Sequence, residues 1–422
     1  MKATPTLLGH AEALVAELMQ FDRPADQAVS AYFRRHRTLG SRDRAFVAET
    51  AYAVLRRRRS LEAAAGSAAP RSLAIAALAR VHGLSARSLE QALTETELAL
   101  VARVRATASA NMPAAVQADL PDWLWERLVA GYGESHAMLI ARGLLNPAPL
   151  DLRVNLARIG RDAALAQLAS RELAGVPTPY APSGIRLEGR PPVNRDPLFA
   201  AGLIEVQDEG SQLLAYLLAP RRGEMVADFC AGAGGKTLAI AMLMRGTGRV
   251  YAMDVSAKRL AALAPRAARA GVSNIHPLVL SGEHDPRAKR LAGKLDRVLV
   301  DAPCSGFGTL RRNPDLKWRY GPDRVSALAE EQFQILTAAS RLVKPGGRLV
   351  YATCSLLTDE NEAVADRFAA LHPEFAPLSC AELLAAQRIP LESSQRLRLW
   401  PHAHGTDGFF AAAFERGQAL PK

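Results

Sequence analysis

The stretch "VADFCAGAGGKT", residues 226–237, combines an apolar strand, a glycine-rich turn and the start of a helix. Gly232, Gly234 and Gly235 allow the backbone to pass close to a ligand. The first turn of the helix that follows offers unpaired N–H donors. A strand that enters a helix through such a turn is typical of α/β folds that bind a nucleotide-like cofactor.

Short apolar strands alternate with helical stretches on both sides of this turn, throughout the part of the chain beyond Gly202. Strands are expected at 225–229, 249–253, 275–280, 296–300 and 348–352, and helices at 256–270 and 323–343. This alternation predicts a parallel sheet with helices on both faces. Ligands of such a sheet bind at the carboxyl ends of its strands.

The first half of the chain has a different texture. Residues 1–130 are rich in alanine and leucine and predict an all-helical domain, in which Ser41 is the expected N-cap of one helix. Arg56–Arg59 extend from that helix as a solvated end or a phosphate-facing patch. Residues 131–205 predict a small α/β module with a strand at 150–155, and residues 206–418 the catalytic domain.

The glycine-rich turn distinguishes between cofactor classes. A Walker loop would need a glycine where Cys230 stands, and nicotinamide enzymes usually show G-x-G-x-x-G where this chain reads G-x-G-G. Asp254 stands at the tip of the next strand, 20 residues beyond Gly234, where it can accept hydrogen bonds from ribose hydroxyls. These features favour S-adenosylmethionine (SAM).

Two of the four cysteines follow predicted strands of the sheet. Cys304 lies in "DAPCSGFG" and Cys354 in "YATCS", so both are expected at the same edge. The chain has no CxxC pair, which argues against disulfides and metal binding, and "PHAHG" at 401–405 is the only weak hint of a metal. We expect no metal site. The remaining possible roles for the cysteines are packing in the core and catalysis.

Methylation of a pyrimidine at C5 would require this set of groups. A thiolate must first add to C6, an acid near N3 must neutralise the charge that forms, and a base must later remove the C5 proton. Asp301 and the two cysteines supply these groups. A thiol of ordinary pKa is only a few per cent ionised at neutral pH, so the site must stabilise the thiolate.

The charge balance points to a polyanionic partner. The 422 residues carry 53 Lys and Arg against 42 Asp and Glu, which gives a net charge of +11 and a pI near 9.8. Such an excess favours nucleic acid, although genome composition also produces arginine-rich chains. The basic segment "TLRRNPDLKWRY", 309–320, is expected either to contact RNA phosphates and stack on bases or to be a solvated loop. No apolar run approaches the roughly 18 residues that span a bilayer, so we expect a cytoplasmic protein without a membrane partner.

With these motifs in place, the chain resembles the RNA cytosine-5 methyltransferases of the bacterial ribosomal RNA small subunit methyltransferase B type (the Sun/Fmu family, related to the nucleolar Nop/Sun proteins). The matching stretches are "VQDEGSQL", "DFCAGAGGKT", "DVSAKRL", "DAPCSGFGTLRRNPDLKW", "YATCSLLTDENE" and "HGTDGFFAAAFER", in the family's order over 206–416. The segment "SRDRAFVAETAYAVLRRRRSLEA" is similar to the family's NusB-like RNA-binding domain. The resemblance implies a Rossmann-like class I SAM-dependent methyltransferase domain, preceded by a small α/β module and an all-helical domain.

The resemblance also implies roles for individual residues. Cys354 of the Thr-Cys-Ser motif is the expected nucleophile toward cytosine C6, Cys304 assists proton removal and product release, and Asp301 contacts the base near N3. The cofactor contacts implied are Cys230, Ala231, Gly232, Ala233, Gly234, Gly235, Lys236, Asp254, Arg259 and Asp301.

The chain departs from the family pattern in two places. The family loop usually reads Ala-Pro-Gly-Gly-Lys, whereas this chain has Gly-Ala-Gly-Gly-Lys at 232–236. Ser281 stands where an acid that contacts the adenine is expected, with Glu283 or Asp285 as substitutes.

The implied product is 5-methylcytosine in small-subunit (16S) ribosomal RNA, made by a monomer. Alternatives are the same chemistry on transfer RNA or another RNA, or a non-catalytic RNA-binding factor of ribosome assembly.

Overall fold

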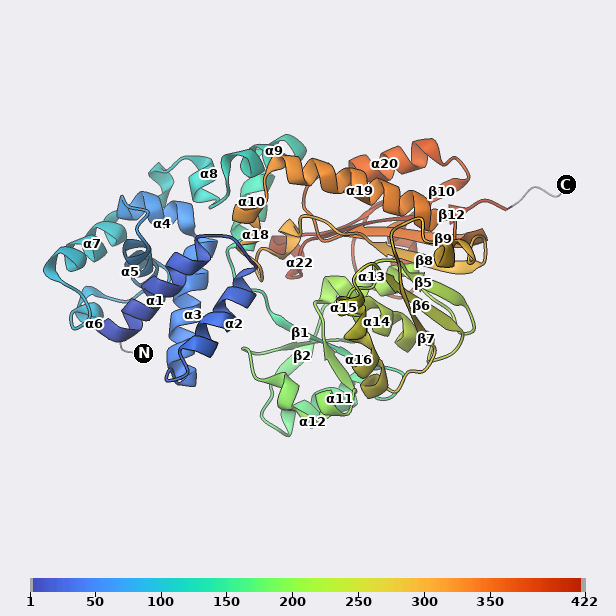
Figure 1. The fold of residues 1–422 in the computed structure, drawn as a ribbon, viewed down its shortest axis with the longest axis horizontal. Helices are drawn as coiled ribbons and strands as arrows, with labels where there is room; N and C mark the ends of the chain where they lie inside the picture. Colours follow the sequence, from blue (N-terminus) through green and yellow to red (C-terminus); the bar gives the residue numbers. More distant parts are fainter. Residues whose placement is uncertain (1–2, 419–422) are drawn as a thin grey trace. The chain divides into compact units, whose positions relative to one another are not determined.

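The computed structural model describes residues 3–418, which divide into two compact units (Figure 1). The first unit holds the chain up to Pro147 together with Thr309–Pro322. The second unit holds Ala148–Gly308 and the chain from Asp323 onward. The second unit therefore sends one segment into the first, immediately after the motif that carries Cys304.

The first unit is all-helical. Helix α1 packs on α3 and α5 around buried side chains such as Leu8, Val47 and Leu73. Its elements are α1 (Pro5–Leu18), α2 (Ala25–Arg35), α3 (Ser41–Arg56), α4 (Arg58–Ala65), α5 (Pro70–Arg80), α6 (Ala86–Leu89), α7 (Glu95–Ala106), η1 (Ser109–Asn111), α8 (Ala114–Gln117), α9 (Asp122–Tyr132), α10 (Glu134–Leu144) and, from the inserted segment, α18 (Leu316–Arg319).

Two sequence predictions about α3 need correction. Ser41 is the first helical residue and not the N-cap; the cap is Gly40, whose N–H donates to Asp43 Oδ2 at 3.2 Å. The arginine run is not a solvated extension of α3, because a new helix starts at Arg58. Within that run Arg58 pairs with Glu62 at 2.6 Å, Arg59 pairs with Asp122 at 2.6 Å, and Arg56 donates to Arg311 O at 3.1 Å.

The inserted segment corrects part of the prediction that 309–320 is an RNA-facing or solvated loop. Lys317 is 3% exposed, and its Nζ donates to the carbonyls of Arg56 at 2.8 Å and Asp119 at 2.7 Å. Trp318 donates its indole N–H to Leu55 O at 2.8 Å. These side chains satisfy backbone carbonyls around the end of α3 and anchor the segment in the helical core.

The second unit begins with a small antiparallel sheet in the order β2-β3-β1-β4. Its strands are β1 (Leu150–Val154), β2 (Gly175–Pro177), β3 (Gly184–Leu187) and β4 (Ile204–Val206), with α11 (Arg161–Ala169), η2 (Val193–Arg195) and α12 (Pro197–Ala200). Leu152, Ile185 and Ile204 meet α11 in a separate core. The strand predicted at 150–155 is confirmed.

The large sheet of the second unit has the order β10-β12-β9-β8-β5-β6-β7, and β11 pairs with β12. Strands β7, β6, β5, β8 and β9 are parallel, whereas β12 runs antiparallel between β9 and β10. The strands are β5 (Met225–Asp228), β6 (Arg249–Asp254), β7 (Ile275–Val279), β8 (Leu295–Asp301), β9 (Val343–Thr353), β10 (Phe375–Leu378), β11 (Leu397–Leu399) and β12 (Phe409–Arg416). All five predicted strands are present.

Helices cover both faces of this sheet, as predicted. Helices α13 and α14 pack on one face with Leu299 and Val350, and α19 and α20 on the other with Val298 and Tyr351. The helices are α13 (Glu209–Leu218), α14 (Gly235–Leu243), α15 (Ala257–Ala261), α16 (Leu263–Ala270), α17 (Pro286–Lys289), η3 (Phe307–Thr309), α19 (Pro322–Ser340), α20 (Glu362–Leu371), α21 (Cys380–Ala385) and α22 (Pro401–His404). The single helix predicted at 256–270 is two helices, because Pro265 lacks an N–H donor and is tolerated only in the first turn of a new helix.

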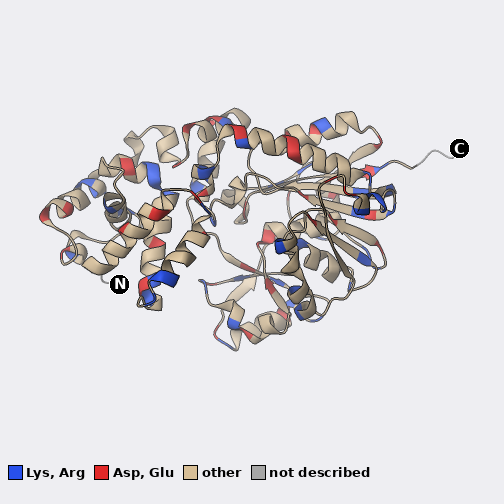
Figure 2. Ribbon diagram, in the orientation of Figure 1, with Lys and Arg blue, Asp and Glu red and all other residues tan. Residues whose placement is uncertain are grey.

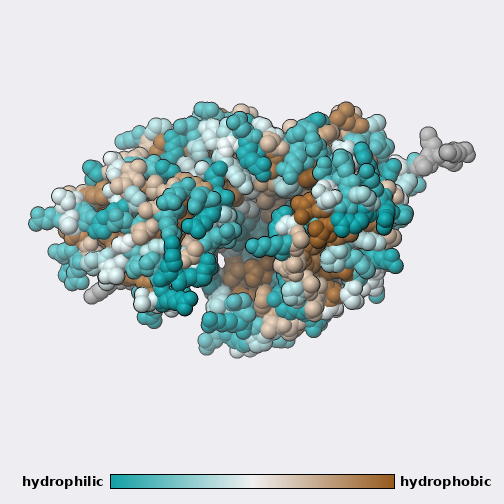
Figure 3. Space-filling view, viewed as in Figure 1, coloured by the Kyte–Doolittle hydropathy of each residue, from teal (hydrophilic) through white to brown (hydrophobic). Residues whose placement is uncertain are grey.

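The surface is polar and mixed in charge. Figure 2 shows acidic and basic positions interspersed within each unit, and Figure 3 shows hydrophobic residues as small islands on the face in view. Among residues 3–418, no helix has the length and apolar character needed to cross a membrane.

Candidate active site

The ends of β8 and β9 bring the two candidate cysteines together. The strands are parallel neighbours, with Asp301 in register with Ala352, so the turns that follow them meet at one edge of the sheet. The sulfurs of Cys304 and Cys354 lie 3.3 Å apart. That separation is a hydrogen-bond contact and much longer than the roughly 2.05 Å of a disulfide, and both thiols are free.

Ionisation of Cys304 is disfavoured in this pair. The hydrogen bond with Cys354, burial and the nearby charges of Cys354, Glu360 and Asp301 all raise the pKa of the Cys304 thiol well above its ordinary value. A neutral Cys304 can donate its S–H to the sulfur of Cys354 in this contact.

Lys236 supplies the positive charge beside this pair. It is the second residue of α14, and its Nζ donates to Asp301 Oδ2 at 2.6 Å. Burial lowers the pKa of Lys236, but the charges of Asp301 and Cys354 outweigh it, so the net shift is upward. An ammonium that stays charged next to Cys354 favours the thiolate over the thiol.

The glycine-rich turn is held by the tip of the next strand. Asp254 Oδ2 accepts the Gly232 N–H at 2.8 Å, and Oδ1 accepts the Ser256 N–H at 2.7 Å and a bond from Arg259 at 3.2 Å. Gly234 has φ +84°, and a Cβ there would lie 2.2 Å from Leu263 Cδ1. Only glycine fits that position, which is glycine both in this chain and in the family's Ala-Pro-Gly-Gly-Lys loop.

The remaining residues of the predicted cofactor loop lie beside these groups. The Ala231 N–H donates to Met253 O at 2.8 Å, Ala233 O accepts a bond from Arg266 at 2.5 Å, and Gly235 O accepts one from Arg153 at 2.7 Å. Burial, followed by the charges of Asp228 and Asp301, raises the pKa of Cys230 well above its ordinary value. Cys230 is therefore a neutral thiol in the wall of the turn.

Two residues at this turn were not among the predicted site residues. Asp228 ends β5 directly before the turn, fully buried, and burial raises its pKa to about 7. Thr237 donates its hydroxyl to Asp228 Oδ2 at 2.7 Å. The signal in the sequence was an acidic residue as the last position of an apolar strand. A cationic cofactor would be the natural partner for such a carboxyl.

In the loop after β7, Ser281 bonds to Asp285, which is one of the two expected substitutes for the family's third-strand acid. The backbone N–H and hydroxyl of Ser281 donate to Asp285 Oδ2 at 2.8 and 2.9 Å. Bonds from Arg287 and from Ser281 hold the pKa of Asp285 well below its usual range. Asp285 is thus an ionised carboxylate that caps α17 and orders the loop.

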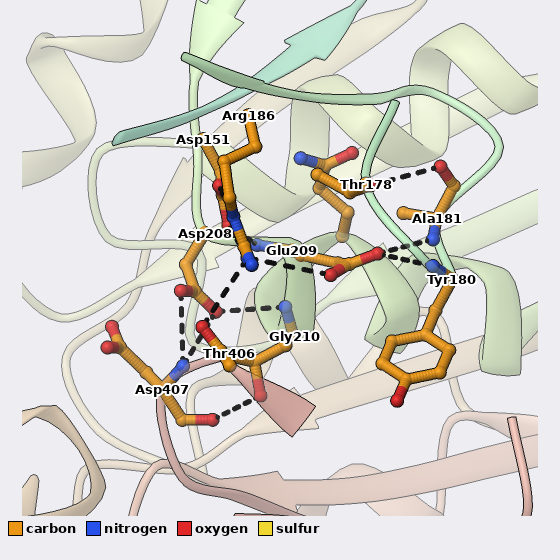
Figure 4. A network of polar contacts seen from close by, with 12 residues as sticks. Asp151, Thr178, Tyr180, Ala181, Arg186, Asp208, Glu209, Gly210, Thr406 and Asp407 are labelled. Carbon is orange, nitrogen blue, oxygen red and sulfur yellow. Dashed lines mark hydrogen bonds and ion pairs between the residues drawn. The ribbon is translucent and has the colours of Figure 1, made fainter. Parts of the chain in front are cut away.

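A buried polar network ties the small sheet to the site (Figure 4). Arg186 donates to Asp151 at 2.7 and 2.9 Å, and Asp151 accepts the Glu209 N–H at 3.3 Å. Asp208, the N-cap of α13, accepts the Asp407 N–H at 3.2 Å. The network therefore joins β1 and β3, the start of α13 and the turn before β12.

Backbone hydrogen bonds connect that turn to Cys354. The Gly408 N–H donates to Gly308 O at 2.9 Å, and the Gly308 N–H donates to Cys354 O at 2.8 Å. A Cβ on Gly308 would lie 2.1 Å from Gly408 O, so this close approach requires glycine. The "HGTDGFF" stretch thus supports the Thr-Cys-Ser turn from the far end of the sequence.

Two protein-family models match parts of this chain. The family model "16S rRNA methyltransferase RsmB/F" matches residues 215–415. A second model, "Methyltr_RsmF/B-like, ferredoxin-like domain", matches residues 120–194. The two matched ranges hold most of the small sheet and nearly all of the large one.

Curated relatives agree with the family models. The "Probable ribosomal RNA small subunit methyltransferase B" of Bacillus subtilis is 36% identical over 309 residues, 72% of this chain and 67% of the relative. The "Ribosomal RNA small subunit methyltransferase B" of Sodalis glossinidius is 41% identical over 254 residues, 60% of this chain and 58% of the relative. The chain thus aligns with about three fifths to two thirds of these relatives.

Solved structures share the fold. A methyltransferase homologue from Pyrococcus horikoshii is 29% identical, with a TM-score of 0.62, 74% of this chain covered and 100% of its own. NSun6 from Pyrococcus horikoshii is 22% identical, with a TM-score of 0.63, 71% of this chain covered and 99% of its own. The predicted fold class, a Rossmann-like methyltransferase domain after an α/β module and a helical region, is confirmed.

Proposed function

Because the chain belongs to the ribosomal RNA small subunit methyltransferase B family, we propose that it methylates C5 of a cytosine in small-subunit (16S) ribosomal RNA. Membership in this family makes SAM the methyl donor, which confirms the cofactor predicted from the sequence. The observation that carries the proposal is the cysteine pair, with Cys304 bonded to Cys354 and Lys236 bonded to Asp301 beside it.

In the proposed mechanism Cys354 acts first. Its thiolate forms a bond to C6 of the cytosine, and the electron pair of the C5–C6 double bond becomes available at C5. Asp301, held by Lys236, contacts the base near N3. The Lys236 ammonium supplies, through Asp301, the proton that N3 takes up as the adduct forms, and takes it back when the base is released. The cofactor, when bound at the glycine-rich turn, supplies the methyl group that C5 takes.

Cys304 acts second. Once Cys354 is a thioether, its charge and its hydrogen bond no longer raise the Cys304 pKa, so Cys304 can release its proton to solvent and become a thiolate. That thiolate accepts the C5 proton, the C5–C6 double bond re-forms, and Cys354 leaves C6 as a thiolate. Each cysteine is thus returned to the form in which it can act again.

The decisive test compares Cys304→Ala with Cys354→Ala on unmodified small-subunit RNA and SAM. Cys304→Ala is expected to accumulate a protein–RNA adduct that survives denaturing electrophoresis, because the release step is missing. Cys354→Ala is expected to form no adduct and to lose methyl transfer by at least about 1,000-fold, since no other group adds to C6. Cys380→Ala, at a buried cysteine packed near β12, is the matched control.

The possible results distinguish a wrong assignment of the nucleophile from a wrong choice of RNA substrate. An adduct in Cys304→Ala that persists when Cys354 is also replaced would assign the nucleophile elsewhere. If wild-type protein leaves ribosomal RNA unmethylated, the same assay with transfer RNA tests the substrate. Methylation of neither RNA would contradict the proposed function.

A further inference from the structure

One buried carboxylate bridges the two cysteine turns. Glu360 is fully buried, and its Oε1 accepts the Ser305 N–H at 2.7 Å and the Gln332 amide at 3.0 Å. Its Oε2 accepts the hydroxyl of Ser305 at 2.5 Å and the hydroxyl of Ser355. Four donors on one carboxylate fix its position closely.

The two serines on Glu360 are the residues that directly follow the two cysteines. The chain carries the Cys-Ser dipeptide twice, at 304–305 and 354–355, and the serine hydroxyl oxygens lie 3.1 Å apart. Tyr351 on β9 donates its hydroxyl to the backbone carbonyl of Glu360 at 2.5 Å, which ties the carboxylate's own backbone to the sheet. Neither cysteine turn can shift relative to the other without breaking a bond to Glu360.

We infer that Glu360 is a positioning residue, which sets the distance between the sulfurs of Cys304 and Cys354 by holding the serine that follows each. The inference rests on the proposed function, in which the two sulfurs act in turn on C5 and C6 of one ring. Because those carbons are adjacent, both sulfurs must stay within reach of the same base. A small displacement of either turn would separate nucleophile and base.

Two substitutions at Glu360 separate position from charge. Glu360→Gln removes the charge and offers an amide nitrogen where two donors already point. Glu360→Asp keeps the charge, but its side chain is one methylene shorter and cannot reach both serines. Both are expected to lower kcat by about 10- to 100-fold with the KM for SAM unchanged. The matched control is Glu362→Gln, two residues on, whose carboxylate pairs with Arg398.

The pH profile of thiol alkylation supplies a readout that needs no RNA. Cys304 is labelled with iodoacetamide at a series of pH values from 6 to 11, and peptide mass spectrometry measures the extent of labelling. The midpoint is the pH at which the labelling rate is half of its maximum. Cys354, Glu360 and Asp301 are the groups that raise the pKa of Cys304. Sulfurs that move apart would lower the Cys304 midpoint in both Glu360 variants, whereas loss of charge alone would lower it in Glu360→Gln only.

The inference is supported if both Glu360 variants lose kcat and show the lowered midpoint while Glu362→Gln matches wild type. It is overturned if either readout is unchanged in Glu360→Asp. If thermal unfolding shows that the Glu360 variants do not fold, Ser305→Ala and Ser355→Ala take their place, and an unchanged midpoint in both overturns it. A wild-type protein that methylates no RNA contradicts the proposed function, yet the alkylation profile still tests Glu360.

Discussion

Lys236 in the second unit and Lys317 in the first both have shifted pKa values, and the two shifts have opposite signs. Lys236 in the second unit bonds a carboxylate, Asp301, and its pKa is raised. Lys317 in the first unit bonds two backbone carbonyls, and burial lowers its pKa to about 7 although Asp119 acts in the other direction. A bonded carboxylate preserves the charge of a buried ammonium, whereas neutral carbonyls satisfy its hydrogen bonds without doing so.

The two lysine side chains therefore have different roles. A lysine that stays charged beside Cys354 can stabilise a thiolate, which is an electrostatic role in a site. A lysine that is half neutral at pH 7 and bonded to Arg56 O and Asp119 O closes the end of a helix, which is a structural role. The same residue type therefore serves chemistry in one unit and packing in the other.

The largest effect is expected from Lys236→Met. Without the ammonium, the Cys354 thiolate and Asp301 are both left without their cation, so methyl transfer should fall by about 100- to 1,000-fold. Single-turnover transfer of a labelled methyl group measures this. Lys258→Met, at an exposed lysine of α15, is the matched control and should match wild type. A Lys236→Met enzyme with more than a tenth of wild-type activity would contradict the electrostatic role.

A smaller effect, on stability, is expected from Lys317→Met. Methionine fills the space but leaves two buried carbonyls without a donor, which should cost about 2 kcal/mol of unfolding free energy. Hydrogen exchange followed by mass spectrometry should show faster exchange in α3 and in 309–322, with exchange in β5–β9 unchanged. Lys289→Met, at an exposed position of α17, should show neither change. If Lys317→Met and Lys289→Met show equal protection from hydrogen exchange, the structural role of Lys317 is contradicted.

The smallest effect is the pH dependence of the stability lost in Lys317→Met. Between about pH 7 and 10 the unfolded chain binds a proton on Lys317 that the folded chain has released, so folded stability rises with pH across this window. The penalty of Lys317→Met should therefore grow, by about 1–2 kcal/mol from pH 7 to pH 9. Urea unfolding of both proteins at the two pH values measures it. A penalty that shrinks with rising pH would mean that Lys317 is charged when folded.

The failed predictions share a physical cause. The segment 309–320 has the composition of an RNA-binding loop, but cations and a tryptophan equally suit the capping of buried helix ends. Nothing in the local sequence says that Lys317 and Trp318 find the carbonyls of Arg56 and Leu55, more than 250 residues earlier. The prediction for the Arg56–Arg59 run failed in the same way for Arg59, because its partners Leu120 O and Asp122 are 61 and 63 residues further along the chain.

The sequence by itself determined the strand pattern, the glycine-rich turn and the place of Asp301, Cys304 and Cys354 at strand ends, because these follow from local periodicity and from the rule that parallel strands end at one edge. Only the tertiary structure decided that the pKa of Cys304 is raised, that Lys236 bonds Asp301, and that Glu360 joins Ser305 to Ser355. Those contacts join residues from different strand ends and helices. Their energies depend on distances and burial, which arise only when the elements pack.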